Sequence, residues 1–154
     1  MEIPGSADSK PLTMSELKTW MKENFANFLS YSIGGNDIDE GFILDHDHTG
    51  YHWIFTERGS RDIHKSFVTE AEAVTYAYQQ IKGDTWAWSH CIGFTPSEDE
   101  HRALAKILNE MGIEFLQDRI NYFANRPGTY RTFVFGKDKL RTLHLAEKYF
   151  KKNS

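Results

Sequence analysis

The segment DHDHTGYH, residues 45–52, gathers side chains that can bind a metal ion. In a strand, His46 and His48 would lie on one face because they are two residues apart, and His52 could add a third ligand from across a hairpin. Catalytic zinc commonly takes three protein ligands and a water. The spacing matches no zinc or calcium motif, however, and polar residues at a hairpin tip are usually solvated. The sequence therefore predicts no metal ligand and no cofactor, and a metal-dependent hydrolase or nuclease built on these histidines is an alternative.

Two adjacent pairs elsewhere in the chain also have the residue types of catalytic groups. His90 and Cys91 could be a base and a nucleophile, but neighbours in a strand point to opposite faces, so we interpret Cys91 as a buried structural thiol. Glu57 and Arg58 could serve acid–base chemistry, but one segment supplies no group to shift the carboxyl pKa or to bind a reacting group. We expect residues 56–60 to be a turn in which Gly59 has a positive φ, with partner contact as its second role. These patterns predict a protein that is not an enzyme.

Charge is unevenly distributed along the chain, which has a formal net charge of −4. The segment 37–47 carries five acidic residues and no lysine or arginine; they are Asp37, Asp39, Glu40, Asp45 and Asp47. From residue 119 onward the balance is basic. A net negative charge disfavours a dedicated nucleic-acid binder, since such proteins need clustered cations. A nucleic-acid-binding accessory protein that uses Lys139 and Arg141 in the basic C-terminal third stays an alternative, although nucleic acid is not the expected partner.

The elements that position these residues begin with helices. Three Ser or Thr residues precede a Glu by three positions, which is the spacing of a capping box; the pairs are Thr13 with Glu16, Thr69 with Glu72, and Ser97 with Glu100. Apolar residues at helical spacing then predict helices that continue to about residue 29, residue 82 and residue 111, the last two stopped by Gly83 and Gly112. Gly34 and Gly35 are interpreted as the stop of the first helix. A fourth helix is predicted from Asp138, as its N-cap, to about Phe150.

Strands are predicted between the helices. Residues 41–47, 51–57 and 62–67 alternate apolar with polar and are joined by short turns, which indicates an antiparallel meander. Residues 113–123 and 129–136 indicate a C-terminal hairpin. Residues 86–94 also alternate and suggest a strand, or a continuation of the preceding helix. The prediction is an α+β fold with an antiparallel sheet, built from the three-stranded meander and the C-terminal hairpin and covered by about four helices.

Length and composition place this fold in one domain, with residues 1–13 as a flexible leader and residues 14–152 as a single α+β domain. Cys91 is the only cysteine, which excludes an internal disulfide and a multi-cysteine zinc site and fits a reducing cytosol. The sequence has neither an apolar run of about 18 residues nor a signal peptide. We therefore expect a cytoplasmic protein that does not contact a membrane.

The segment from Trp53 to Ala73 carries a resemblance to a known class of proteins. An aromatic strand, WIFTERG, ends in a Glu-Arg-Gly turn, and a short strand then leads to the helix start FVTEAEA and a tyrosine-containing helix. Over residues 51–82 the chain resembles the small immunity proteins of bacterial polymorphic toxin systems. This resemblance implies a non-enzymatic cytoplasmic protein that binds one cognate toxin and neutralises it by covering its active site.

On this interpretation the acidic segment would occupy a cationic toxin site as a phosphate mimic, and exposed aromatic residues would anchor the contact. The predicted partner-binding residues are Asp37, Asp39, Glu40, Asp45, Asp47, Tyr51, Glu57, Arg58 and Trp86. The predicted partner is the cognate toxin, and the inhibitor itself is expected to be a monomer or weak dimer.

Overall fold

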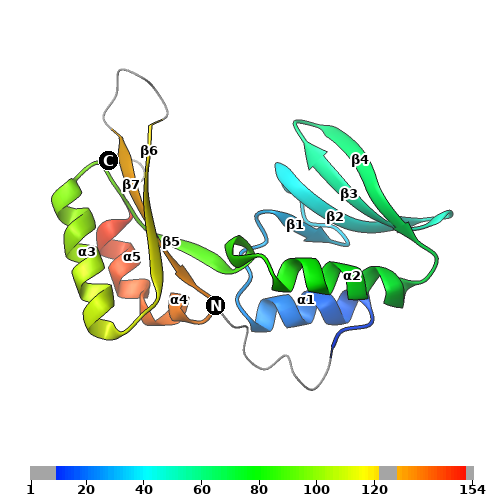
Figure 1. The fold of residues 1–154 in the computed structure, drawn as a ribbon, viewed down its shortest axis with the longest axis horizontal. Helices are drawn as coiled ribbons and strands as arrows, with labels where there is room; N and C mark the ends of the chain where they lie inside the picture. Colours follow the sequence, from blue (N-terminus) through cyan, green and yellow to red (C-terminus); the bar gives the residue numbers. More distant parts are fainter. Residues whose placement is uncertain (1–9, 122–127, 152–154) are drawn as a thin grey trace. The chain divides into compact units, whose positions relative to one another are not determined.

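The computed structural model describes residues 10–121 and 128–151, which form two compact units that meet in the sequence between Trp88 and Ser89 (Figure 1). Each unit has its own hydrophobic cluster, where the sequence analysis expected one domain over residues 14–152. Most of the predicted leader lies outside the described residues. Its end is part of a helix cap, because the amide N–H groups of Leu12 and Thr13 donate to Glu16 Oε1.

Two helices belong to the first unit, α1 (Met14–Glu23) and α2 (Glu70–Lys82). Both begin as predicted, with the hydroxyl of Thr13 or Thr69 accepting the amide N–H three residues on. The prediction that the first helix continues to residue 29 is wrong. Helix α1 ends at Glu23, and Phe25 and Phe28 have φ values of 60° and 56°, which leave the right-handed helical region.

The sheet of the first unit has the strand order β1 (Tyr31–Ile33), β2 (Glu40–Asp47), β3 (Gly50–Glu57) and β4 (Ser60–Phe67). The predicted antiparallel meander is confirmed as β2, β3 and β4. Strand β1 was not predicted, and it pairs with β2 in parallel, so the sheet is mixed. Gly34 and Gly35 follow this strand, and the interpretation that they stop a helix is wrong.

The two faces of this sheet have different environments. Helices α1 and α2 both lie along one face, here called the inner face (Figure 1). Leu44 and Trp53, which are cross-strand partners, lie on the inner face and pack into the cluster built with both helices. Residues of opposite parity must lie on the other face, here called the outer face. It includes the paired Ile43 and Ile54, and the paired Asp45 and His52.

Aromatic rings make up much of the inner cluster. Phe42 and Trp53 stack with ring centroids 5.0 Å apart and planes 6° apart, and Trp20 lies 4.6 Å from Tyr78 and 5.1 Å from Trp88. Aromatic pairs at such separations add stabilisation of about 0.5–1.5 kcal/mol each beyond the area they bury. Trp53 also meets the ring of Tyr76 of α2 edge-on at 5.9 Å, so the meander packs against the helices and leaves its outer face on the other side.

The second unit consists of β5 (Ser89–Thr95), α3 (Glu98–Met111), β6 (Phe115–Ile120), β7 (Thr129–Phe135), α4 (Asp138–Arg141) and α5 (Leu143–Tyr149). The predicted C-terminal hairpin is confirmed as the antiparallel pair β6 and β7. It does not extend the meander, however, because β5 pairs with β7 to form a separate antiparallel sheet in the order β5-β7-β6. The α+β class is confirmed, and the single antiparallel sheet is corrected to one mixed and one antiparallel sheet.

Two local predictions in this region need correction. The fourth predicted helix is divided at Thr142, whose buried hydroxyl donates to the carbonyls of Asp138 and Lys139. Trp86 and Trp88 are not in a strand but in the 3₁₀ helix η1 (Thr85–Trp88), and the strand begins only at Ser89. Within the described ranges, no helix combines the length and apolar character that crossing a bilayer requires.

Candidate functional site

The outer face of the β1–β4 sheet collects acidic residues from the segment 37–47. Asp45 and Asp47 alternate along β2 and therefore share this face, opposite His52 and Gly50 of β3. The connection between β1 and β2 carries Asp37 to the same face, where it lines a pocket together with Asp45. Asn36 fixes this connection, because its side-chain N–H group donates to the carbonyls of Phe28 and Tyr31. Three of the five predicted acidic contact residues thus come together on one surface.

The pocket has a volume of about 330 Å³ and a mixed lining. Its main side chains are Asp37, Asp45, Arg61, Thr56, Ile38 and Ile43. This size is near the lower end of the usual range for ligand sites, about 300–1,000 Å³. The pocket combines two carboxylates, one guanidinium and an apolar wall, which is a lining that suits a small polar or charged group.

The charged groups in this pocket are only partly satisfied. Asp45 Oδ1 accepts the amide N–H of His46 at 2.8 Å, which leaves Oδ2. Within the part of the chain that the structure describes, Asp37 and Arg61 make no ion pair and no side-chain hydrogen bond. Thr56 donates its hydroxyl to the carbonyl of Ser60 at 3.0 Å and keeps its oxygen as an acceptor. Two carboxylates and a guanidinium therefore line the same pocket without neutralising one another.

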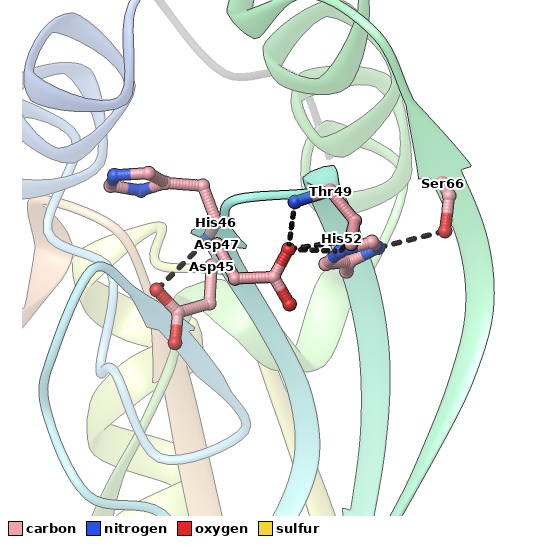
Figure 2. A network of polar contacts seen from close by, with 6 residues as sticks. All are labelled: Asp45, His46, Asp47, Thr49, His52 and Ser66. Atoms are coloured by element: carbon pink, nitrogen blue, oxygen red, sulfur yellow. Dashed lines mark hydrogen bonds and ion pairs between the residues drawn. The ribbon is translucent and has the colours of Figure 1, made fainter.

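Beside the pocket, a polar network surrounds His52 on the central strand β3 (Figure 2). His52 is 7% exposed, its Nδ1 lies 2.8 Å from Ser66 Oγ of β4, and its Nε2 lies 3.0 Å from Asp47 Oδ1 of β2. Thr49 Oγ1 is also 2.9 Å from Nε2. Asp47 Oδ1 accepts both the amide N–H and the hydroxyl of Thr49, at 2.8 and 2.5 Å. The ring of His52 thus joins three strands at one end of the sheet.

These hydrogen bonds affect the acidity of Asp47. They hold the pKa of its carboxyl below the usual range, first through the Thr49 hydroxyl, next through the Thr49 amide and then through His52. Ser66, His52 and Asp47 thus form a serine–histidine–carboxylate arrangement, which also occurs in enzymes with a serine nucleophile. Ser66 and His52 do not line the neighbouring pocket, however, so a ligand held there beside Asp45 would not meet them. The network therefore fixes the hairpin end, and the sequence analysis did not identify Thr49 or Ser66 as its members.

The metal-binding alternative finds no support in the positions of the histidines. His46 pairs with Tyr51 and stacks on its ring at 5.3 Å on the inner face, whereas His52 pairs with Asp45 on the outer face. The possible third ligand, His52, therefore lies on the opposite face of the sheet from His46, and His48 lies in the turn after β2. In the described ranges, no group of three or more His, Cys, Asp or Glu side chains is placed to hold a metal ion.

The Glu-Arg-Gly segment is the turn between β3 and β4. Arg58 and Gly59 have φ values of 51° and 84°, so the positive φ predicted for Gly59 is confirmed, and Arg58 shares it. Two consecutive positive φ values are the signature of a type I′ hairpin turn. The register between β2 and β3 places Glu57 opposite Glu40, and contact with the Glu40 carboxyl raises the pKa of Glu57. The neighbouring Glu40 carboxyl therefore disfavours the ionised form of Glu57.

The remaining predicted contact residues lie apart from the pocket. Asp39 is exposed in the connection before β2. Tyr51 is half-buried on the inner face, against His46, and so does not share a face with Asp45. Trp86 is 49% exposed in η1, where its amide N–H donates to Asp84 Oδ1 and its carbonyl accepts from Asn27. The nine predicted residues therefore do not form one continuous site, and the acidic outer face is the part that the structure assembles.

The second unit carries the basic residues of the C-terminal third, and several of them are paired. Arg131 donates to both carboxylate oxygens of Asp118, at 2.8 and 2.5 Å, and Lys151 lies 2.5 Å from Glu100. Arg141 binds Asp138 at 3.3 Å, while Lys139 is exposed. Arg126 and Lys152 lie outside the described residues. Pairing of this kind reduces the positive charge that nucleic acid would meet.

Cys91 has the environment of a structural thiol. It is half-buried in β5, and its Sγ lies 3.2 Å from the carbonyl oxygen of Gly93, to which the thiol donates. Burial raises the pKa of this thiol, which disfavours the thiolate needed for nucleophilic chemistry.

Comparison of the chain with protein-family models, curated proteins and solved structures gives no match.

Proposed function

We propose that this protein is an inhibitor of the immunity type, which binds a cognate bacterial toxin in the cytoplasm and covers its active site without catalysing a reaction. The observation that carries the proposal is the gathering of Asp37, Asp45 and Asp47 on a sheet face that lies opposite the two helices of its unit. A toxin that acts on nucleic acid or nucleotides presents cations to its substrate, and an acidic surface on a sheet is complementary to them. Such complementarity speeds encounter and selects the partner.

The edge strand β4 supports a protein that acts as a monomer or weak dimer. Its backbone edge is a potential template for pairing with another strand, but Arg61, Asp62 and Lys65 place charges along it. Charged residues on an edge strand oppose such pairing. The exposed ring of Trp86 is a candidate aromatic anchor, separate from the acidic face.

The test is capture of the partner by tagged full-length protein from a lysate of its own host, with identification of what remains bound by mass spectrometry. The proposal expects one toxin-domain protein whose toxicity is suppressed by co-expression. Asp45→Asn combined with Asp47→Asn should slow association and reduce its dependence on salt, because fewer charges steer the encounter. Retention of metal or of nucleic acid, with no protein partner, would overturn the proposal.

A further inference from the structure

The pocket on the outer face makes it possible to specify the partner further. We propose that it receives one arginine side chain of the bound protein, whose guanidinium lies between Asp37 and Asp45. This inference rests on the proposed inhibitor function, since it assumes that a protein partner covers the outer face. It adds a defined contact to what is otherwise a general attraction between charged surfaces.

The first argument is the charge of the pocket. Asp37 and Asp45 contribute two negative charges and Arg61 one positive charge, so the pocket has a net charge of −1. One added cation neutralises it. Asp37 has no hydrogen-bond or ion-pair partner within the described residues, and Asp45 keeps Oδ2 free. Two acceptors are therefore available to a guanidinium, which donates in a planar fork that matches carboxylates.

The second argument is the unmet acceptor at the base of the connection. Asn36 lines the same pocket, and its Oδ1 is buried without a hydrogen bond within the described residues. This oxygen is closed to a ligand in the pocket, but its partial negative charge adds to the charge of the two carboxylates and disfavours a ligand that brings further acceptors. This condition favours a guanidinium over a phosphate.

The third argument is the shape and apolar part of the lining. Ile38 and Ile43 form an apolar wall, against which the methylene groups of an arginine can pack while its head reaches the carboxylates. A pocket of about 330 Å³ suits one long side chain rather than a nucleotide with its sugar and phosphates. Arg61, on the neighbouring edge strand, repels a second cation and so limits the pocket to one.

Because Arg61 is positively charged and Asp37 and Asp45 are negatively charged, their substitution should change the affinity for a cation in opposite directions. If the ligand is a cation, Arg61→Gln should tighten binding, and Asp37→Asn or Asp45→Asn should weaken it. If the pocket instead bound an anion through Arg61, all three effects would reverse. Asp62→Asn is the matched control, because Asp62 is an exposed carboxylate of β4 that faces away from the pocket, opposite Phe55.

The experiment is an NMR titration of the full ¹⁵N-labelled chain at low salt with Nα-acetyl-argininamide. The matched probes are Nα-acetyl-citrullinamide, which has the same shape without charge, and inorganic phosphate. We expect millimolar binding of the arginine probe, with shifts at amides of residues 35–38, 43–45 and 59–61, and weaker binding of the citrulline probe. Each pocket Asp→Asn change should weaken binding by about three- to fivefold, as for exposed ion pairs, and Asp62→Asn should not. Equal binding of the neutral probe, preference for phosphate, or no shift at these residues would overturn the inference.

Failure of the inference can be separated from failure of the proposed function. If a toxin is captured and the Asp37→Asn/Asp45→Asn double variant binds it as tightly as the unaltered protein, the pocket inference fails and the inhibitor function stands. If the arginine probe binds in the pocket but no protein partner is captured, the inhibitor function fails and the cation site stands.

Discussion

Asp47 Oδ1 and His52 Nε2 lie 3.0 Å apart across the β2–β3 hairpin, and the opposite nitrogen of the same ring lies 2.8 Å from Ser66. This contact joins an exposed carboxylate to a buried imidazole on the central strand. It becomes an ion pair only when His52 is protonated. The folded chain lowers the pKa of Asp47 and raises that of Glu57, so these carboxyls of β2 and β3 make its stability depend on pH with different signs.

Asp47→Asn should destabilise the protein at neutral pH, with an effect that fades in acid. The pKa of Asp47 lies below its usual value of 3.8 in the folded chain, first because the Thr49 hydroxyl donates to it. The ionised carboxylate thus stabilises the fold above pH 3.8, and this contribution is lost as the pH falls toward the lowered pKa. The difference in melting temperature between the two proteins should be constant from pH 7 to pH 5 and shrink below pH 4. A difference at pH 2 that is as large as the difference at pH 7 would contradict the assignment.

Glu57→Gln should have the opposite effect. The Glu40 carboxyl raises the pKa of Glu57 above its usual value of 4.5, so the folded chain disfavours the ionised form. The resulting penalty is absent below pH 4.5 and appears as the pH rises through the raised pKa. The variant should melt at a higher temperature than the unaltered protein at pH 7, and the two should coincide in acid. Glu40→Gln is the matched control and should behave alike; lower stability of both variants at pH 7 would refute the like-charge pair.

Ser66→Ala should cost about 1 kcal/mol of stability, since it leaves Nδ1 of the buried His52 without its partner. Urea unfolding followed by tryptophan fluorescence measures this in the right unit, because Trp20, Trp53, Trp86 and Trp88 all precede Ser89. Repeating the change in a His52→Leu background gives a double-mutant cycle. In that background Ser66→Ala should be nearly neutral. An undiminished cost would show that Ser66 acts through another contact.

Local signals explain which parts of the fold the sequence predicts. Thr13, Thr69 and Ser97 each cap a helix because the hydroxyl and the amide that it binds are only three residues apart. The meander is equally local, with two-residue turns between alternating strands. By contrast, β1 has only three residues, too few to show a periodicity of its own, and Phe25 and Phe28 match the helical spacing although their backbone leaves the helix. Alternation also does not specify partners, so it could not show that β5 pairs with β7.

The same distinction applies to the site. The alternation of Asp45 and Asp47 places them on one face from sequence alone, and the structure agrees. The pairing of His52 with Ser66 follows from the register between β3 and β4, which includes a bulge between Trp53 and Ile54. The pocket depends on a connection that crosses the face and brings Asp37 to Arg61. A single sequence shows neither the register between β3 and β4 nor the path of the connection between β1 and β2.

Two glycines of the same unit should respond differently to alanine. Gly59 has φ 84° in the type I′ turn, and a Cβ there would meet no atom within 4 Å, so Gly59→Ala should cost only the left-handed strain of about 1–2 kcal/mol. Gly41 also has a positive φ, but its Cβ would lie 2.0 Å from the carbonyl oxygen of Ser30, which accepts the amide of Phe42. Gly41→Ala must therefore displace β1 from β2 in addition to straining the backbone.

The same urea experiment distinguishes the two costs. Gly59→Ala should lower the midpoint modestly. Gly41→Ala should lower it further, and it should also weaken binding of the arginine probe, because the connection that carries Asp37 starts from β1. Equal midpoints for the two variants would show that the approach of Ser30 to Gly41 does not constrain the sheet, and that the parallel pairing of β1 with β2 can relax without consequence for the outer face.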